Sequence, residues 1–282
     1  MNGKLIADSI KESLKSEYID KIPTLVIIQV GNNEASNVYI RNKIKACQEI
    51  GIKAKLFHYD EETPQYYLIE EIQHLNADKN VHGVIVQLPL PEHLDSYTII
   101  NSINPNKDVD GFTDNNLGKL TSFKDGIIPA TPKGICTLID RYNIDVQDKS
   151  VVIIGRSNTV GRPLANLLSS KAYNGNVTLL HSKTSKNNII KYCKDADIII
   201  VCCGVPKFLT KEFIGFNKPV VIDVGIHRIN NKLCGDVDYD EIKDLCSYIT
   251  PVPGGVGPMT VVSLIENTME AFNNQIYGEK LS

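Results

Sequence analysis

Hydrophobic and polar positions alternate along the first 120 residues in a way that predicts helices and strands in turn. Residues 24–30 form a nearly continuous apolar, β-branched run, which is typical of a strand buried on both faces. A helical period from 34 to 50 ends at Gly51, a residue suited to a helix C-cap. The predicted series is helix 4–16, strand 24–30, helix 34–50, strand 53–59, helix 64–76 and strand 83–88. This alternation predicts an α/β domain with a mostly parallel sheet.

A second α/β series follows a loop-like stretch at 122–134, which we interpret as a crossing between domains. Beyond a helix near 133–142, the apolar run 150–154 leads directly into a glycine-containing turn and a helix. Further strands are predicted at 176–180, 196–201 and 219–223, which makes a Rossmann-like βαβ series. The last predicted helix, 260–276, begins at Thr260 as its N-cap, and the pattern does not assign it to either domain.

Composition and charge narrow the class of protein. The chain has 282 residues, of which 42% are hydrophobic and 22% charged, as in an ordinary globular protein of about two domains. A net charge of −3 and a pI near 6.1 give no basic surface for nucleic acid or anionic membranes. The early charges and the lack of an apolar run of about 18 residues argue against a signal peptide or membrane helix, so we expect a cytoplasmic protein. The seven cysteines and six histidines show no metal-ligand spacing, and no metal is expected.

Tyr39 and Lys43 lie four residues apart, more than a hundred residues ahead of the nucleotide loop described next. A Tyr-x-x-x-Lys pair after such a loop would indicate a short-chain dehydrogenase, whereas a pair before it belongs to a separate domain that meets the cofactor across a cleft. Ser36 shares the predicted helix face with both residues. For Lys43 the alternative is a solvated basic face, since Lys45 follows closely.

The nucleotide loop is the segment 155–163, Gly-Arg-Ser-Asn-Thr-Val-Gly-Arg-Pro, placed where a strand meets a helix. Glycine allows the backbone to approach a pyrophosphate closely, and a helix N-terminus favours the anion. The next strand ends in His181-Ser-Lys-Thr184 without the acid that NAD-binding folds place there. Together with Arg156 this favours NADP. The alternatives are a strand–helix turn without a ligand and a solvated polar turn.

Three further segments carry candidate chemistry. Gln87 stands where the strand 83–88 leaves the sheet, a place where open α/β sheets bind ligands. Asp108-Val-Asp110 forms either a capping turn or half of a metal site, and the absence of a third acid nearby argues against metal. The stretch 250–260, with three glycines and three prolines, predicts a stiff loop whose free N–H groups cradle a ligand.

Seven motifs in this order resemble the bifunctional methylenetetrahydrofolate dehydrogenase/methenyltetrahydrofolate cyclohydrolase family (the FolD family), over nearly the whole chain. They are residues 39–43, 83–91, 107–111, 131–134, 155–163, 181–184 and 251–260. One departure is visible: after Val224-Gly-Ile226 the family usually has Asn, and this chain has His227. That loop lies by the nicotinamide in the family, so the departure bears on cofactor affinity.

The resemblance implies two reactions at one site. NADP takes a hydride from methylenetetrahydrofolate, and water then attacks the methenyl cation to give 10-formyltetrahydrofolate. Lys43 would manage the proton of the hydration step, with Gln87 tuning it. Tyr39 would stack on the aminobenzoyl ring, and Asp110 would accept hydrogen bonds from the pterin.

The resemblance also implies an α/β fold of two domains flanking a cleft. An N-terminal catalytic domain would comprise 1–121 and 262–282, and a Rossmann-like NADP-binding domain 122–261, through which homodimers form. The expected catalytic residues are Lys43, Gln87, Tyr39 and Asp110. The expected substrate-binding residues are Ser36, Tyr39, Asp110, Pro253, Gly254 and Gly255. The expected cofactor-binding residues are Gly155, Arg156, Ser157, His181, Ser182, Ile226, Gly257 and Thr260.

Two other classes stay open from the residues alone. A different NADP oxidoreductase on the same two-domain plan would share the Arg156 loop without needing Tyr39, Lys43 and Asp110 together. A non-catalytic nucleotide sensor would keep the loop and tolerate the loss of Lys43. The presence of Lys43 with Gln87 argues against the second class.

Overall fold

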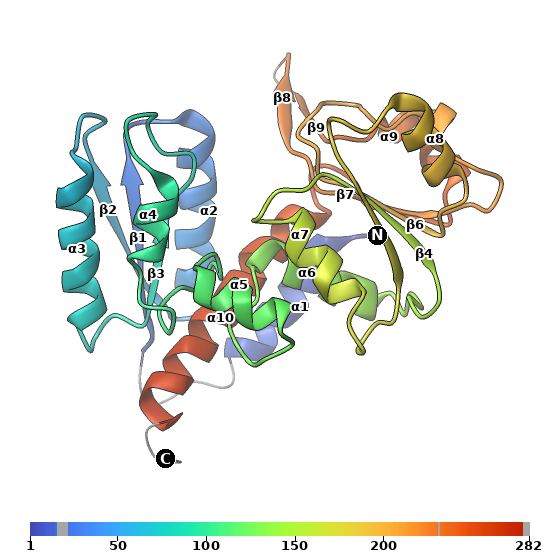
Figure 1. Ribbon diagram of the computed structural model, residues 1–282. Coiled ribbons are helices and arrows are strands. Elements are labelled where there is room, and N and C mark those ends of the chain that lie inside the picture. Colours follow the sequence, from blue (N-terminus) through green and yellow to red (C-terminus); the bar gives the residue numbers. More distant parts are fainter. Residues whose placement is uncertain (16–21, 231, 279–282) are drawn as a thin grey trace. The chain divides into compact units, whose positions relative to one another are not determined.

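The computed structural model describes residues 1–15, 22–230 and 232–278. Contacts within the chain divide it into two compact units. The three-stranded unit comprises residues 9–130 and the chain from 261 onward, and the five-stranded unit comprises residues 1–8 and 131–260. Two helices, α1 (Gly3–Lys15) and α10 (Val256–Tyr277), have residues in both units (Figure 1).

The three-stranded unit is built on a parallel sheet in the order β2-β1-β3. Its strands are β1 (Thr24–Val30), β2 (Lys53–Tyr59) and β3 (Gly83–Val86), and its helices are α2 (Glu34–Glu49), α3 (Gln65–Ala77), α4 (Ser96–Asn101) and α5 (Asp114–Thr121). The chain places β2 on one side of β1 and then crosses to place β3 on the other. The topological switch point therefore lies between β1 and β3, and open α/β sheets bind ligands at the carboxyl ends of such strands.

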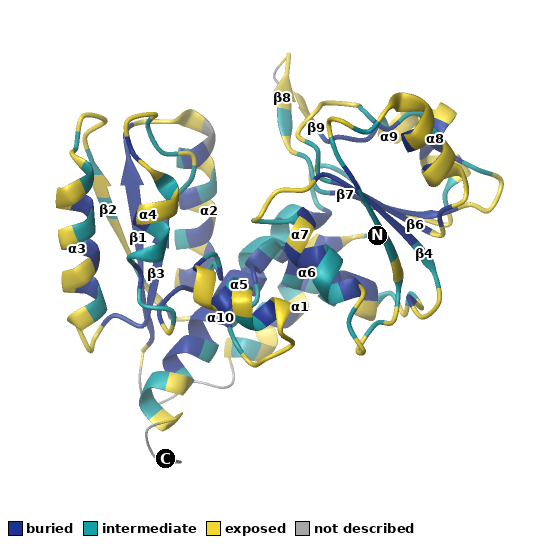
Figure 2. Cartoon of the chain, in the orientation of Figure 1, coloured by how far each residue is buried: buried dark blue, intermediate teal, exposed yellow. Residues whose placement is uncertain are grey.

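Alternate residues of β1 serve two different cores. Leu25 and Ile27 pack with residues of α2 and α10, whereas Val26 and Ile28 pack with residues of α3 and α4. Figure 2 shows β1 buried along its length while the outer faces of α2 and α3 are exposed. Burial on both faces is the physical reason for the continuous apolar run of this strand.

The five-stranded unit has a parallel sheet in the order β10-β7-β6-β4-β5. Its elements are α6 (Ala130–Arg141), β4 (Ser150–Ile154), α7 (Gly161–Leu168), β5 (Asn176–Leu180), α8 (Lys186–Lys194), β6 (Ile198–Val201), β7 (Val220–Asp223), α9 (Tyr239–Ile242), β10 (Tyr248–Ile249), the 3-10 turns Lys211–Phe213 and Lys243–Leu245, and the antiparallel hairpin β8 (His227–Ile229) and β9 (Lys232–Cys234). Side chains of α6 and α7 share one core with the sheet, and those of α8 and α9 share another. This doubly wound arrangement has its switch point between β4 and β6.

The predicted α/β class is confirmed, and several boundaries need correction. The predicted loop 122–134 is too long, because α6 begins at Ala130. The last helix begins at Val256, not at Thr260, since Pro258 falls in the first helical turn, where a missing N–H is harmless. The pattern did not predict α4, α5, α8, α9, β10 or the hairpin. Residue 16 of the predicted first helix lies outside the described residues.

The contact units also differ from the expected domain limits at residues 1–8, at residues 122–130 and at residue 261, which groups with the three-stranded unit. Residues 1–8 group with the five-stranded unit: the Met1 ammonium donates to the Ile249 carbonyl, and the Lys4 N–H donates to the Gly254 carbonyl at 3.1 Å. Residues 122–130 group with the three-stranded unit, where Pro129 packs against Gly111. Within the described ranges, no helix is both long and apolar enough to cross a membrane.

Candidate active site

Lys43 lies on the buried side of α2 in the three-stranded unit. It is only 8% exposed, whereas Lys45, two positions further on, is exposed. Ser36 is buried and Tyr39 is half-buried, so the three residues predicted to share a face are all at least partly covered. The solvated basic face considered for Lys43 is therefore wrong. Asn33 caps the helix by accepting the Ser36 N–H at 3.0 Å.

Gln87 stands at the switch point of the three-stranded sheet and meets Lys43 there. Its backbone N–H donates to the Ile28 carbonyl at 2.8 Å, which continues the pairing beyond β3. Lys43 Nζ donates to Gln87 Oε1 at 3.2 Å, and Gln87 Nε2 donates to the Leu88 carbonyl at 2.8 Å. The second bond fixes which end of the amide faces the lysine. A neutral amide oxygen accepts from the ammonium without taking its proton, and the bond occupies one of three N–H donors.

Asp108 and Asp110 have different surroundings. Asp108 is 1% exposed and accepts backbone N–H groups from Gly111 at 2.9 Å and Thr113 at 2.8 Å. The capping-turn interpretation is therefore confirmed for Asp108. A parallel bridge pairs Asp108 with Val84 of β3, so the chain continues towards Asp110 in the direction of the strand's carboxyl end.

The carboxyl group of Asp110 is electrostatically coupled to Lys43. Burial raises the pKa of Asp110, the positive charge of Lys43 acts to lower it, and Asp108 raises it further. Lys43, Gln87 and Asp110, called here the lysine cluster, thus come from three segments of one unit and meet at one edge of its sheet. Tyr39 lies one helical turn before Lys43 on α2, and burial raises the pKa of its phenol.

The glycine loop of the five-stranded unit joins β4 to α7 beside the second switch point. Gly155 has a φ of +131°, and a Cβ there would lie 2.3 Å from the Cys202 carbonyl oxygen. A Cβ on Gly161 would lie 2.0 Å from the Gly155 carbonyl oxygen, so both positions require glycine for the loop's own packing. Ser157 Oγ accepts the Val160 N–H at 3.1 Å and thereby serves the start of α7.

Two exposed polar positions flank this loop. Arg156 is exposed, and in the described part of the chain no ion pair engages its guanidinium. After β5, the His181 N–H donates to Thr184 Oγ1 at 3.1 Å and the Lys183 N–H donates to His181 Nδ1 at 3.2 Å. This closes a turn in which Ser182 and Lys183 are exposed.

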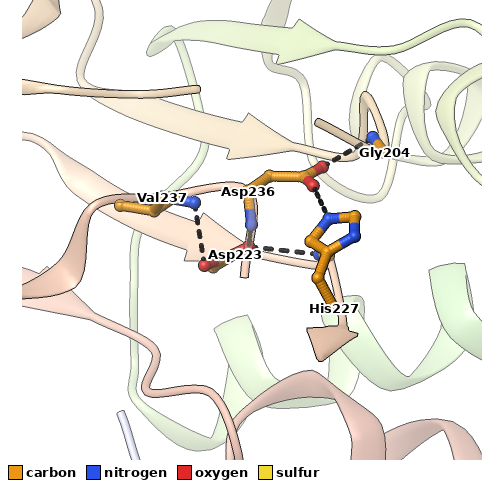
Figure 3. A network of polar contacts seen from close by, with 6 residues as sticks. Gly204, Asp223, His227, Asp236 and Val237 are labelled. Carbon is orange, nitrogen blue, oxygen red and sulfur yellow. Dashed lines mark hydrogen bonds and ion pairs between the residues drawn. The ribbon is translucent and has the colours of Figure 1, made fainter. Parts of the chain in front are cut away.

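Asp223, at the end of β7, organises the loops that follow it (Figure 3). It is 2% exposed, and its carboxylate accepts backbone N–H groups from Gly225 at 3.1 Å, Asp236 at 2.8 Å and Val237 at 3.1 Å. Burial raises its pKa to about 7, while the three backbone N–H donors favour the ionised form. A Cβ on Gly235 would lie 1.8 Å from Asp223 Oδ2, so this backbone must pass directly over the carboxylate.

His227 joins the same network through Asp236. Asp236 is fully buried, accepts the Gly204 N–H at 2.9 Å and lies 2.7 Å from His227 Nε2 (Figure 3). The preceding residue, Ile226, is exposed, and its Cδ1 would lie 3.4 Å from a Cβ on Gly257. The loop after β7 and the first turn of α10 therefore lie together within the five-stranded unit.

The loop at 250–260, predicted to cradle a ligand with its free N–H groups, packs against the first helix of the chain. The Gly254 carbonyl accepts the Lys4 N–H at 3.1 Å, and a Cβ on Gly3 would lie 2.0 Å from the Gly255 carbonyl oxygen, so α1 packs against this loop. Pro253 is exposed. Thr260 is a helical residue, and its hydroxyl lies 3.1 Å from that of Thr131.

Comparison with protein families identifies the chain. A model described as tetrahydrofolate dehydrogenase/cyclohydrolase, catalytic domain, matches residues 1–110, and one described as the NAD(P)-binding domain of the same proteins matches residues 129–276. The chain belongs to the tetrahydrofolate dehydrogenase/cyclohydrolase family. The resemblance drawn from the seven motifs is confirmed.

Individual relatives match this chain over nearly its full length. The bifunctional protein FolD of Agathobacter rectalis is 47% identical over 277 residues, covering 96% of this chain and 98% of the relative. The crystal structure of the bifunctional FolD enzyme of Campylobacter jejuni is 42% identical, with a TM-score of 0.92 and 98% of each chain covered. The Trypanosoma brucei dehydrogenase-cyclohydrolase, complexed with NADP and an inhibitor, is 32% identical, with a TM-score of 0.93 and 98% of each chain covered.

The residues of this family member fit a dinucleotide with a 2′-phosphate. The glycine loop stands at the switch point of a doubly wound sheet, where nucleotides bind. The turn after β5 has no carboxylate to hold or repel a 2′ substituent, and Arg156 is exposed nearby in the preceding loop. Among the described residues no group of three or more His, Cys, Asp or Glu side chains is placed to hold a metal ion.

Sequence reasoning missed three buried polar residues that hold the two sites in shape. They are Asp223 and Asp236 in the five-stranded unit and Asn267 in the three-stranded unit. Asp223 stands at the end of a predicted strand, a signal that was available. Asn267 gave no local signal, because a polar residue in a helical pattern is usually solvated.

Proposed function

We propose that this family member oxidises 5,10-methylenetetrahydrofolate with NADP and then hydrolyses the 5,10-methenyltetrahydrofolate to 10-formyltetrahydrofolate. The observation that carries the proposal is the lysine cluster. A buried Lys43 amine is bonded to Gln87 and coupled to the Asp110 carboxyl at the ligand-binding edge of the three-stranded sheet. A sensor or an unrelated oxidoreductase has no need for this arrangement.

The glycine loop and its neighbours bind NADP in this proposal, and NADP when bound accepts the hydride of the methylene carbon. Arg156 and Ser182 bind the 2′-phosphate from the two exposed turns, since a guanidinium pairs with phosphate through two parallel hydrogen bonds. Gly155, Ser157, His181, Ile226, Gly257 and Thr260 complete the cofactor site. Of these, Ile226 and Gly257 already lie together, which supports a shared surface.

The three-stranded unit binds the folate. Asp110 accepts two hydrogen bonds from the amino and ring N–H groups of the pterin, for which its carboxyl must be ionised. The positive charge of Lys43 acts in that direction by lowering the pKa of Asp110 against the effect of burial. Tyr39 stacks on the aminobenzoyl ring, and Ser36 completes the folate contacts of this unit. Pro253, Gly254 and Gly255, which belong to the five-stranded unit, are the other proposed substrate-binding residues.

Lys43 handles the proton of the hydration step. Water that adds to the cationic methenyl carbon must lose a proton, and the neutral form of the Lys43 amine accepts it. The resulting ammonium then gives this proton to the ring nitrogen that leaves when the ring opens, while the hydroxyl proton of the adduct passes to solvent as the formyl group forms. Gln87 holds the Lys43 amine in place through its amide oxygen. Because an amide does not ionise, Gln87 does not itself take up a proton during the reaction.

The test is a pair of spectrophotometric assays on the purified protein. Methylenetetrahydrofolate is supplied with NADP or with NAD, and methenyltetrahydrofolate is supplied alone to follow its hydrolysis above the uncatalysed rate. Turnover with NADP in the first assay and catalysed hydrolysis in the second are expected. Absence of both activities, with intact folding by circular dichroism, would show that the proposal is wrong.

We also propose that the protein is a cytoplasmic homodimer, as the family resemblance implies. Sedimentation velocity over a range of concentrations distinguishes monomer from dimer, and fractionation of the source cells tests the location. A purely monomeric species at micromolar concentration would contradict the first point.

A further inference from the structure

Asn267 is a fully buried amide in α10 that donates two hydrogen bonds to backbone carbonyls. Its Nδ2 donates to the carbonyl of Val109 at 2.9 Å and to that of Ile128 at 2.8 Å. Burying a polar side chain costs free energy unless it is paired, and an apolar residue would fill a helix position inside a core more cheaply. The amide therefore holds two separate loops of the three-stranded unit together.

The two loops also touch each other directly beside Asp110. Gly111 has a φ of +72°, and a Cβ there would lie 2.8 Å from the Pro129 nitrogen and 2.9 Å from the Ile127 carbonyl oxygen. The chain at 127–129 thus packs on the backbone that immediately follows Asp110. Asn267 bonds to one residue of each loop and fixes this contact from the helix side.

The backbone of Asp110 is consequently held on both sides. Asp108 accepts the N–H groups of Gly111 and Thr113, and Asn267 donates to the carbonyl of Val109. A carboxylate that must accept two hydrogen bonds from a flat heterocycle tolerates little change in position or direction. The bonds of Asp108 fix the chain after Asp110, and the bond of Asn267 fixes the peptide directly before it.

We propose that Asn267 is a positioning residue for folate recognition, which acts through the Val109 carbonyl on the Asp110 carboxylate. The proposal rests on the proposed function, and specifically on Asp110 as the pterin ligand. It requires a side chain with two N–H donors at this place. Neither an aliphatic residue nor an ionised carboxylate supplies them.

The experiment measures the KM for methylenetetrahydrofolate, the KM for NADP and the kcat of Asn267→Leu, which keeps much of the side-chain volume but has no donor. We expect the folate KM to rise about tenfold, the scale of losing a buried donor, and the NADP KM to change by less than about twofold. Asn267→Ser, which leaves space for water to bridge, should shift the folate KM in the same direction by a smaller factor and serves if the Leu variant does not fold.

The matched control is Gln275→Leu on the same helix. Gln275 Nε2 donates to the carbonyls of His82 at 2.8 Å and Asn106 at 3.1 Å, so this variant loses bonds of the same kind that do not end next to Asp110. Its folate KM should stay at the wild-type value. A rise equal to that of Asn267→Leu would show a general loss of α10 packing and would overturn the proposal.

A double-variant cycle separates positioning from structural damage. If Asn267 acts through Asp110, the variant carrying both Asp110→Ala and Asn267→Leu should bind folate no worse than Asp110→Ala alone. Independent, multiplying losses would refute the proposal, as would an unchanged folate KM in Asn267→Leu. If Asp110→Ala itself leaves the folate KM unchanged, the proposed role of Asp110 fails first, and the two failures are thereby distinguished.

Discussion

Replacing Lys43 by Met should separate the two activities of this family member. Methionine keeps the length and apolar stem of the side chain but removes the amine that donates to Gln87 Oε1 at 3.2 Å. It also removes the positive charge that acts to lower the pKa of Asp110. The first loss falls on the hydration step and the second on folate binding, so the variant tests both proposed roles of Lys43.

The magnitudes of the two losses differ. Loss of a general acid–base lowers a rate by about 10² to 10⁴, which is about 2.7–5.4 kcal/mol at 1.36 kcal/mol per tenfold. Hydride transfer needs no proton movement, so the dehydrogenase kcat should fall far less. Its folate KM should rise, because burial now raises the pKa of Asp110 without opposition from Lys43. Because the Asp110 carboxyl ionises as pH rises, the folate KM of the variant should decrease with increasing pH.

The assays are hydrolysis of methenyltetrahydrofolate and NADP reduction with methylenetetrahydrofolate, each across a pH series. Lys45→Met is the matched control, since Lys45 is an exposed lysine on the same helix, and it should leave both activities at the wild-type level. Full cyclohydrolase activity in Lys43→Met would refute the proton-transfer role. An equal loss of kcat in both reactions would show instead that Lys43 only shapes the site.

Three further predictions concern the cofactor, the substrate and stability. Arg156→Ala should weaken NADP binding by about 1.5–3 kcal/mol and leave NAD kinetics unchanged, and the exposed control Arg141→Ala, outside the nucleotide loop, should leave NADP binding at the wild-type level; equal wild-type efficiency with both cofactors would contradict the assignment. Asp110→Ala should impair both reactions, and a chelator should impair neither; activity lost to the chelator and restored by a divalent cation would show that a metal is required. Burial raises the pKa of Asp223 to about 7, so the folded protein binds the carboxyl proton of Asp223 more tightly than the unfolded chain does. The wild-type free energy of unfolding should therefore decrease as pH rises from about 4 to about 7, by at most about 1.4 kcal/mol per pH unit. Urea denaturation of wild type and Asp223→Asn across that range should show a flatter dependence in the variant, and identical slopes would exclude the effect.

Much of the fold could be predicted from local patterns. The strands at 24–30, 53–59 and 176–180 have the predicted limits. Only the first is buried along its whole length, which accounts for its continuous apolar run. The other two are partly exposed edge strands, and the glycine that lies shortly before each of them and the polar residue that follows it mark their limits. Short or weakly periodic elements were missed. The helix α4 has six residues and β10 has two, too few for a hydrophobic period to be visible. The start of α10 was placed four residues late, because glycine and proline at 257–258 predict a loop unless the helix packs around them.

The family, the fold class and the candidate reactive side chains could all be predicted from residue types and from the order of motifs along the chain. The burial and the partners of those side chains could not, because they depend on segments that meet only in the folded protein. Lys43 and Lys45 are alike in sequence, but the switch point at Gln87 buries one of them and solvent surrounds the other. Asp108 and Asp110 are the same residue type two positions apart, but Asp108 accepts backbone N–H groups whereas Asp110 interacts with the charge of Lys43. The peptide before Asp110 is held by Asn267, which is 158 positions from Val109 along the chain and which only folding brings within hydrogen-bond distance of the Val109 carbonyl.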